Sequence, residues 1–311
     1  MSRSSSTEPK PFDVGRESAD GAFVRQTSAF RDHLSTDGST AFGWEAGRYH
    51  LYVALACPWS HRAVIARKLK GLEDAIGISY AHPFRDARGW AFPGDGFTDD
   101  VNGWSLLSQG YEQTDPAFEG RGTVPLLWDK ETGRAVSNES HDILRMFDAV
   151  GDDVTELYPE RLRGEIDAVN ELVYDSVNNG VYRVGFSRTQ EAYDAAFDQL
   201  FAALDQLEER LGAQRYLAGD VITEADWRLF VTLVRFDAVY VLHFRCSRNR
   251  IVDFPNLWAY TRELYQQPGI AETVAMDEIK RHYYTTHDEL NPKRIIPRGP
   301  RTDFTAPHGR G

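Results

Sequence analysis

The sequence has very few cysteines. Two stand among 311 residues, Cys57 and Cys246, and they lie far apart in the chain. So few thiols exclude a disulfide-stapled scaffold, and they leave a zinc site without the paired cysteines that it usually needs. We therefore expect no bound metal and a reducing, cytoplasmic setting in which a free thiol persists.

Long apolar runs and excess positive charge are also missing. No stretch approaches the ~20 apolar residues of a membrane span, and the first ten residues lack the apolar centre of a secretory signal. Lys and Arg number 35 against 47 Asp and Glu, which gives a net charge of −12. We expect neither nucleic acid nor a membrane as a partner, because both attract basic surfaces.

The apolar content is nevertheless sufficient for a core, and the character of the chain changes midway. Hydrophobic residues make up 41% and charged residues 26%, which is typical of a globular protein. An extension is expected to gain order around Phe23, Phe30 and Trp44. We predict four regions, which are an extension over 1–45, an α/β domain over 46–150, an all-helical domain over 151–290 and a tail over 291–311.

An apolar run leads directly into Cys57. Residues 50–55 are predicted to form a buried strand, and a helix-compatible run continues to Leu69. Cys57 then stands at the helix N-terminus, with Pro58 in the first turn, a position that proline favours. Backbone N–H groups there carry partial positive charge, so the Cys57 thiol should ionise easily and act as a nucleophile. A buried structural cysteine is the alternative interpretation.

The motif Cys57-Pro58-Trp59-Ser60 ends in serine where a second cysteine would stand in a Cys-x-x-Cys pair. Cys57 therefore has no local thiol with which to close a disulfide. A mixed disulfide formed on Cys57 would have to be resolved by an external thiol, which predicts a small thiol as partner.

The remainder of the α/β region gives the order βαβ-ββα, the thioredoxin arrangement. A second strand is predicted over 76–81, an irregular connection over 82–120, a strand over 122–129, a short strand over 134–137 and a helix over 141–147. An irregular connection of that length is uncommon in a compact domain and tends to be functional.

Two dipeptides in this region could hold a ligand. Val124-Pro125 opens a strand with a proline that can be cis, so Val124 could offer its backbone N–H and C=O to a peptide. Glu139-Ser140 falls where a helix begins, so the serine hydroxyl and free N–H groups could bind an anion, and Glu139 an ammonium group. A strand-edge proline and a plain helix cap are the alternatives.

The second half of the chain is helical. Apolar spacings of three and four residues predict helices over 162–177 and 193–211, which we expect to end at Gly180 and Gly212. Residues 225–236 are apolar on nearly every face, which indicates a buried helix, and Thr223 with Asp226 resembles a capping box. Further helices are predicted over 256–266 and 270–282.

Tyrosines are frequent in this helical half. Most such tyrosines belong to cores. Some could instead bind an aromatic substrate, supply a proton, or hydrogen-bond the thiolate, and spacing alone does not choose among these roles. The seven are Tyr174, Tyr182, Tyr240, Tyr260, Tyr265, Tyr283 and Tyr284.

Together these features resemble a glutathione transferase, with a thioredoxin-like N-terminal domain and an all-helical C-terminal domain. The stretch from Gly219 to Phe230 is similar to the helix-capping segment of that superfamily. More narrowly, the chain resembles the xi class, the glutathionyl-hydroquinone reductases. This likeness is carried by residues 56–62, 178–186, 228–237 and 279–284 and by Asn291-Pro292.

The resemblance implies a role for particular residues. Cys57 would be the nucleophile, Tyr182 the proton donor to the aromatic ring, and Tyr240 and Tyr283 the hydroxyls that stabilise the thiolate. Glutathione would be the co-substrate, and the chain would form homodimers. The implied glutathione-binding residues are Trp90, Arg121, Gly122, Thr123, Val124, Glu139 and Ser140.

The implied reaction is removal of glutathione from a glutathionyl-hydroquinone. Cys57 would take up the glutathionyl group as a mixed disulfide, and a second glutathione would release glutathione disulfide. An omega-like thioltransferase and a conjugating transferase or dehalogenase are alternatives, although conjugating enzymes often use Ser or Tyr where Cys57 stands. A non-catalytic binding protein is the third alternative.

Overall fold

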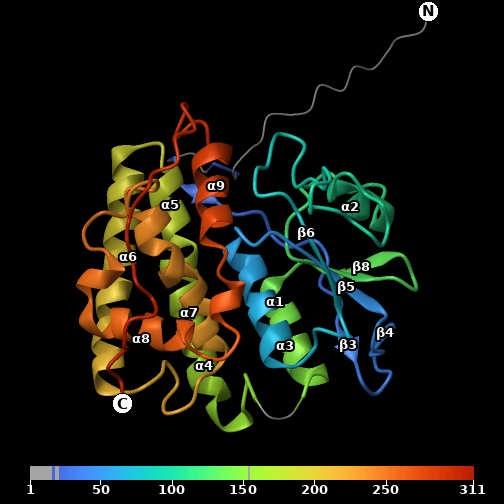
Figure 1. Cartoon of the computed structure of the whole chain (residues 1–311), viewed down its shortest axis with the longest axis horizontal. Coiled ribbons are helices and arrows are strands. Elements are labelled where there is room, and N and C mark those ends of the chain that lie inside the picture. The colour runs from blue at the N-terminus through green and yellow to red at the C-terminus, as the bar shows by residue number, and fades with distance from the viewer. Residues whose placement is uncertain (1–15, 18–20, 153–154) are drawn as a thin grey trace, which may run out of the picture.

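The computed structural model describes residues 16–17, 21–152 and 155–311. Part of the predicted extension lies outside these residues. Figure 1 shows a small sheet on one side, the later helices on the other, and helices α1 and α3 between them. Within the described residues, no helix combines the length and apolar character needed to cross a membrane.

The sheet has four strands in the order β6-β5-β7-β8. β5 (Tyr49–Val53) pairs parallel with β6 (Gly77–Tyr80) and antiparallel with β7 (Leu126–Asp129), which pairs antiparallel with β8 (Arg134–Ser137). Helix α1 (Pro58–Leu69) connects β5 to β6, and α3 (Ser140–Val150) follows β8. The predicted thioredoxin order is confirmed, although β7 begins after Pro125 rather than at residue 122.

The connection predicted to be irregular contains a helix, α2 (Ser108–Thr114). Gly110 lies inside it, and glycine is a poor helix former, which hides the periodicity. The glycine is required by packing, since a Cβ at this position would lie 2.5 Å from the Trp104 ring.

The helical half follows the predicted spacing except at Gly180. Gly180 does not end a helix, because the chain passes from α4 through a π-helical turn into α5, and Gly180 opens α5. α6 ends one residue after Gly212, as predicted. The main elements are α4 (Arg163–Leu172), η2 (Val173–Asn178), α5 (Gly180–Phe186), α6 (Gln190–Ala213), α7 (Glu224–Arg235), η3 (Phe236–Tyr240), α8 (Pro255–Tyr265) and α9 (Met276–Thr286).

The last predicted helix begins later than expected. A short 3-10 turn, η5 (Ala271–Thr273), precedes α9, which extends to Thr286. Two other 3-10 turns are η1 (Glu160–Leu162) and η4 (Ile251–Asp253). Helix α7 is buried along its whole length, and the capping box of Thr223 and Asp226 at its start is confirmed.

Both end segments pack on the body. The predicted anchors of the extension are ordered: Phe23 stacks on Tyr182, Phe30 packs on Tyr111, and Trp44 stacks on Tyr49. The extension contributes short strands β1 (Arg16–Glu17), β2 (Phe23–Val24), β3 (Leu34–Ser35) and β4 (Phe42–Gly43). The tail runs along α8, where the Gln266 side chain donates to the carbonyls of Phe304 and Ala306 at 2.8 Å.

Candidate functional site

Cys57 is the N-cap of α1, with extended backbone and Pro58 in the first turn. Its N–H donates to the Ala54 carbonyl at 2.9 Å, and its own carbonyl accepts from His61 N–H at 3.0 Å. The side chain is half-buried, and its sulfur lies 3.7 Å from the Val124 carbonyl oxygen. The fold therefore brings together the cysteine and the Val-Pro segment, which are far apart in the sequence.

The loop before Cys57 is held by an arginine of the helical half. Arg235, at the end of α7, is fully buried. Its guanidinium donates to the carbonyls of Leu55 at 3.0 Å and Ala56 at 3.2 Å, and it lies 2.9 Å from Nδ1 of His61. The position of Cys57 therefore depends on packing between the sheet and the helices.

A cavity of about 280 Å³ lies beside Val124. Five of the predicted glutathione residues line it, and they are Arg121, Thr123, Val124, Glu139 and Ser140. The Val124–Pro125 peptide bond is cis. Helix starts and backbone segments of this kind suit an elongated, charged peptide.

The other two predicted residues lie apart from the lining. Gly122 approaches α2, where a Cβ would lie 3.3 Å from the Ser108 backbone. Trp90 is buried, with its ring stacked 4.9 Å from that of His282 and the Arg85 guanidinium 5.2 Å above it. The roles of both residues remain predictions.

Glu139 and Ser140 stand at the start of α3. One Glu139 oxygen caps the helix by accepting from His141 N–H at 3.1 Å, and the other accepts from the Ser28 hydroxyl at 2.8 Å. The Ser140 hydroxyl accepts from Arg62 at 3.3 Å, which leaves its own proton available for a ligand. Glu139 is thus a helix cap, which was the alternative interpretation of Glu139-Ser140, and it also lines the cavity.

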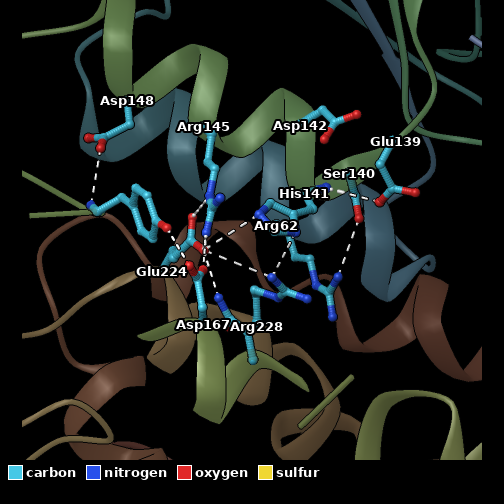
Figure 2. Close-up of polar contacts among 12 residues, drawn as sticks. Arg62, Glu139, Ser140, His141, Asp142, Arg145, Asp148, Asp167, Glu224 and Arg228 are labelled. Carbon is cyan, nitrogen blue, oxygen red and sulfur yellow. Dashed lines mark hydrogen bonds and ion pairs between the residues drawn. The ribbon is translucent and has the colours of Figure 1, made fainter. Parts of the chain in front are cut away.

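A buried network connects this helix start to the helical half (Figure 2). At its centre is Glu224, the first residue of α7, whose side chain is fully buried. Its carboxylate accepts from Arg145 at 2.9 Å and from the Asn170 amide at 2.7 Å, and Arg228 lies 3.9 Å away. Arg228 in turn reaches Nδ1 of His141 at 2.9 Å.

The charges in this network follow from burial. Burial, followed by the nearby Arg228, lowers the pKa of His141 to about 2, so this ring is neutral at pH 7 and forms no ion pair with Glu224. Burial lowers the pKa of Arg62 to about 9, which leaves Arg62 charged at pH 7. The Arg62 guanidinium also lies 4.4 Å above the ring of Trp59.

Three predicted tyrosines form one cluster. The Tyr283 hydroxyl lies 2.6 Å from that of Tyr182 and 3.1 Å from that of Tyr240. Burial raises the pKa of each, so all three are neutral donors at pH 7. Three hydroxyl protons serve two internal hydrogen bonds, which leaves one proton for a thiolate or a substrate.

The cluster lies near the cysteine turn, because the Arg25 guanidinium is 4.6 Å from the ring of Tyr182 and 4.7 Å from the ring of Trp59, two residues after Cys57. Burial has the largest effect on the pKa of Tyr182 and raises it, the nearby Arg25 cation lowers it, and the charge of an ionised Cys57 raises it. The hydrogen bonds of Tyr240 and Tyr283 go to the cluster itself rather than to Cys57. Their predicted thiolate-stabilising role is therefore still a prediction.

Buried histidines lie behind this cluster. Nε2 of His243 is 3.2 Å from Nδ1 of His287, and the His282 and His287 rings are 5.6 Å apart. Burial lowers the pKa of His243 to about 4 and of His282 to about 3, and on the sheet it lowers that of His50 to about 4.

We expect acid to destabilise the chain steeply. Six histidines have folded-state pKa values below the ordinary 6.5, so the unfolded chain binds more protons, and their stabilisation is lost as pH falls from 6.5 towards 4. They are His50, His61, His141, His243, His282 and His287. His50, His243 and His282 alone contribute about 4 kcal/mol per pH unit to this loss, one proton each. Urea unfolding followed by tryptophan fluorescence at several pH values measures this slope.

A single substitution checks the origin of that slope. His243→Gln should reduce it by about 1.4 kcal/mol per pH unit, the share of one proton. An unfolding free energy that is the same at pH 7 and at pH 5 would contradict the assignment.

Sequence patterns missed several residues of the site. Arg25, Gln26, Ser28 and Arg31 line the cavity from the extension, which carries no motif that would place it there. Arg235 lies within a segment quoted for the resemblance, but its contacts with Leu55 and Ala56 join positions about 180 residues apart. No periodicity reports such long-range contacts.

Comparison with known proteins identifies two family domains in the chain. The glutathione S-transferase N-terminal domain matches residues 56–150, and the glutathione S-transferase C-terminal domain matches residues 190–263. These matches cover Cys57, the cavity residues of the sheet half and most of α6 to α8.

Individual relatives match over nearly their full length. The chain is 49% identical over 308 residues to glutathionyl-hydroquinone reductase YqjG of Escherichia coli, covering 94% of each chain. It is 47% identical over 290 residues to glutathionyl-hydroquinone reductase PcpF of Sphingobium chlorophenolicum, covering 91% of each.

Solved structures agree with the described fold. The glutathione-bound structure of YqjG superimposes with a TM-score of 0.87, covering 90% of this chain and 96% of that one at 49% identity. A Xi class transferase from Natrialba magadii gives a TM-score of 0.88 at 48% identity, covering 94% and 95%. The chain therefore belongs to the glutathione S-transferase family, among the Xi class transferases and glutathionyl-hydroquinone reductases.

Proposed function

We propose that this chain reduces glutathionyl-hydroquinones to hydroquinones at the expense of glutathione. One observation carries the proposal: the Cys57 sulfur faces the Val124 carbonyl at 3.7 Å, beside a cavity for a charged peptide and within electrostatic range of a neutral tyrosine cluster. The activities of YqjG and PcpF, as named, support the same reaction.

The first half-reaction transfers sulfur to the enzyme. The Cys57 thiolate attacks the glutathionyl sulfur, and an S–S bond forms as the bond between sulfur and the ring carbon breaks. The electron pair of that bond goes to the ring carbon, which takes a proton from Tyr182. Free hydroquinone leaves, Cys57 remains as a mixed disulfide with glutathione, and Tyr182 regains its proton from solvent.

The second half-reaction restores the thiolate. A glutathione thiolate attacks the mixed disulfide, glutathione disulfide leaves, and Cys57 is released. Ser60 offers no competing thiol, so the resolving sulfur comes from glutathione. Arg121, Thr123, Val124, Glu139 and Ser140 would hold the tripeptide, with Trp90 and Gly122 as further predicted contacts.

Tyr182→Phe should slow only the first half-reaction. Without the phenolic proton, hydroquinone release should fall by about 100-fold or more. Reaction of glutathione with a preformed Cys57 mixed disulfide should keep its rate, and stopped-flow measurement of each half separates the two. Tyr284→Phe is the matched control, because the Tyr284 hydroxyl donates to the Ala238 carbonyl at 3.0 Å, outside the cluster. Equal slowing of both halves would contradict the proton-donor role.

A pair of assays separates this function from its alternatives. Glutathione disulfide formed from a glutathionyl-hydroquinone, with ping-pong kinetics, supports the reductase. A conjugate formed from a chloronitrobenzene instead would support a conjugating transferase. Activity in neither assay would support a non-catalytic binding protein.

The proposal also covers the oligomeric state of the chain and its cellular compartment. We infer a homodimer, from the likeness to the Xi class, and a cytoplasmic setting, since Cys57 must remain reduced to act. Light scattering coupled to size-exclusion chromatography tests the dimer, and a monomer at micromolar concentration would contradict it.

A further inference from the structure

An arginine of the N-terminal segment, Arg25, is among the residues that line the glutathione cavity. Arg25 lies next to β2, and its guanidinium lies 4.7 Å above the ring of Trp59 and 4.6 Å from that of Tyr182. Its Nε donates to the Asn179 side chain at 2.7 Å. Its Nη2 is buried and, among the described residues, has no hydrogen-bond partner.

The charges around the cavity leave a place for an anion. Arg121 and Arg31 also line it, and the Arg31 guanidinium is held by Asp142 through two bonds of 2.7 and 2.9 Å. Glu139 is the carboxylate in the lining, and its oxygens accept from Ser28 and His141. Within the described part of the chain no carboxylate pairs with Arg25. A buried N–H donor without an acceptor costs free energy, and a ligand that accepts a hydrogen bond from it would remove that cost.

We propose that Arg25 binds the α-carboxylate of the γ-glutamyl residue of glutathione, an inference that rests on the proposed function. That residue carries an ammonium and a carboxylate on one carbon. Glu139 supplies the acceptor for the ammonium, while Ser140 and Arg25 supply donors for the carboxylate, and all three line the same cavity. A guanidinium fork matches a carboxylate better than a single hydroxyl does.

The position of Arg25 also joins this subsite to the proton donor. The guanidinium that would hold the carboxylate stacks between Trp59, two residues after Cys57, and Tyr182. The rings fix the plane of the guanidinium, and Asn179 fixes its direction. An extension residue would thereby align the bound tripeptide with both reacting groups.

Calorimetric titration of the whole chain with three ligands tests the proposal without turnover. The ligands are glutathione, 4-aminobutyryl-cysteinyl-glycine, which lacks the α-carboxylate, and γ-glutamylcysteine, which lacks the glycine. Arg25→Met should weaken binding of glutathione and γ-glutamylcysteine by about tenfold to a hundredfold. It should leave binding of the decarboxylated ligand unchanged.

Other outcomes overturn the proposal. If Arg25→Met weakened the binding of all three ligands equally, Arg25 would be a structural support of the cavity. If only the binding of γ-glutamylcysteine stayed unchanged, Arg25 would instead contact the glycine carboxylate. Unchanged binding of glutathione would exclude Arg25 from the site. The titration measures binding and not turnover. A failure of the Arg25 proposal can therefore be distinguished from a failure of the proposed reductase function.

Two further variants keep the test decisive. Arg262→Met is the matched control, since Arg262 also stacks on a ring, 4.9 Å above Trp258, and its buried Nε has no partner in the described part of the chain. Arg262 lies on α8, away from the cavity. This variant should bind all three ligands normally. If Arg25→Met does not fold, Arg25→Lys keeps the charge and should show the same ligand pattern with a smaller loss.

Discussion

Replacing Cys57 with alanine is expected to lower the rate of glutathione disulfide formation by about 1,000-fold or more, because the reaction then has no sulfur to accept the glutathionyl group. Binding of glutathione should survive, since the cavity beside Val124 is formed by other residues. Steady-state kinetics with a glutathionyl-hydroquinone measures the first effect, and titration calorimetry the second.

The second cysteine gives the control. Cys246 is fully buried, and burial raises the pKa of its thiol well above the usual value, so it is a poor nucleophile. Cys246→Ala should keep turnover near that of the parent chain. Full activity in Cys57→Ala, or its loss only in Cys246→Ala, would refute the assigned nucleophile.

Replacing Glu224 with alanine is expected to cost about 3–5 kcal/mol of unfolding free energy, because it leaves the buried Arg228 charge without a carboxylate and removes a partner of the partly buried Arg145. Arg145 bonds Glu224 at 2.9 Å, Arg228 lies 3.9 Å from it, and the Glu224 side chain is fully buried. Urea unfolding followed by circular dichroism measures the loss.

An exposed pair provides the contrast. Glu165 forms an ion pair with Arg210, and its side chain is 47% exposed. Glu165→Ala should cost at most about 1 kcal/mol, as surface pairs do. Similar costs for the two variants would mean that Glu224 contributes through helix capping or packing rather than through the buried charges.

Local patterns predicted much of the fold. The strand-turn-helix around Cys57, the ββα order after it and the spacing of apolar residues in α4 and α6 all reflect interactions between neighbours in the sequence. The prediction that a helix ends at Gly180 was wrong, because helical backbone continues through η2 into α5. Local patterns treat glycine as a helix end and do not detect the tertiary packing that keeps it inside a helical stretch. The domain boundary at residue 150 stays a prediction.

The site was predictable only where a motif or a resemblance marked it. Cys57, Val124 and Glu139 stand at helix and strand ends, which sequence patterns locate well. Arg25 and Arg235 act through contacts with residues more than 150 positions away, and a single sequence carries no signal for such pairs.

Intact-protein mass spectrometry can show directly whether Cys57 takes up the glutathionyl group. The chain is mixed with one equivalent of a glutathionyl-hydroquinone in the absence of free glutathione. We expect one added glutathionyl group, mapped by digestion to Cys57, together with an equal amount of free hydroquinone. Addition of glutathione should then remove the group from Cys57. Hydroquinone release with unmodified Cys57 would exclude Cys57 as the acceptor of the glutathionyl group.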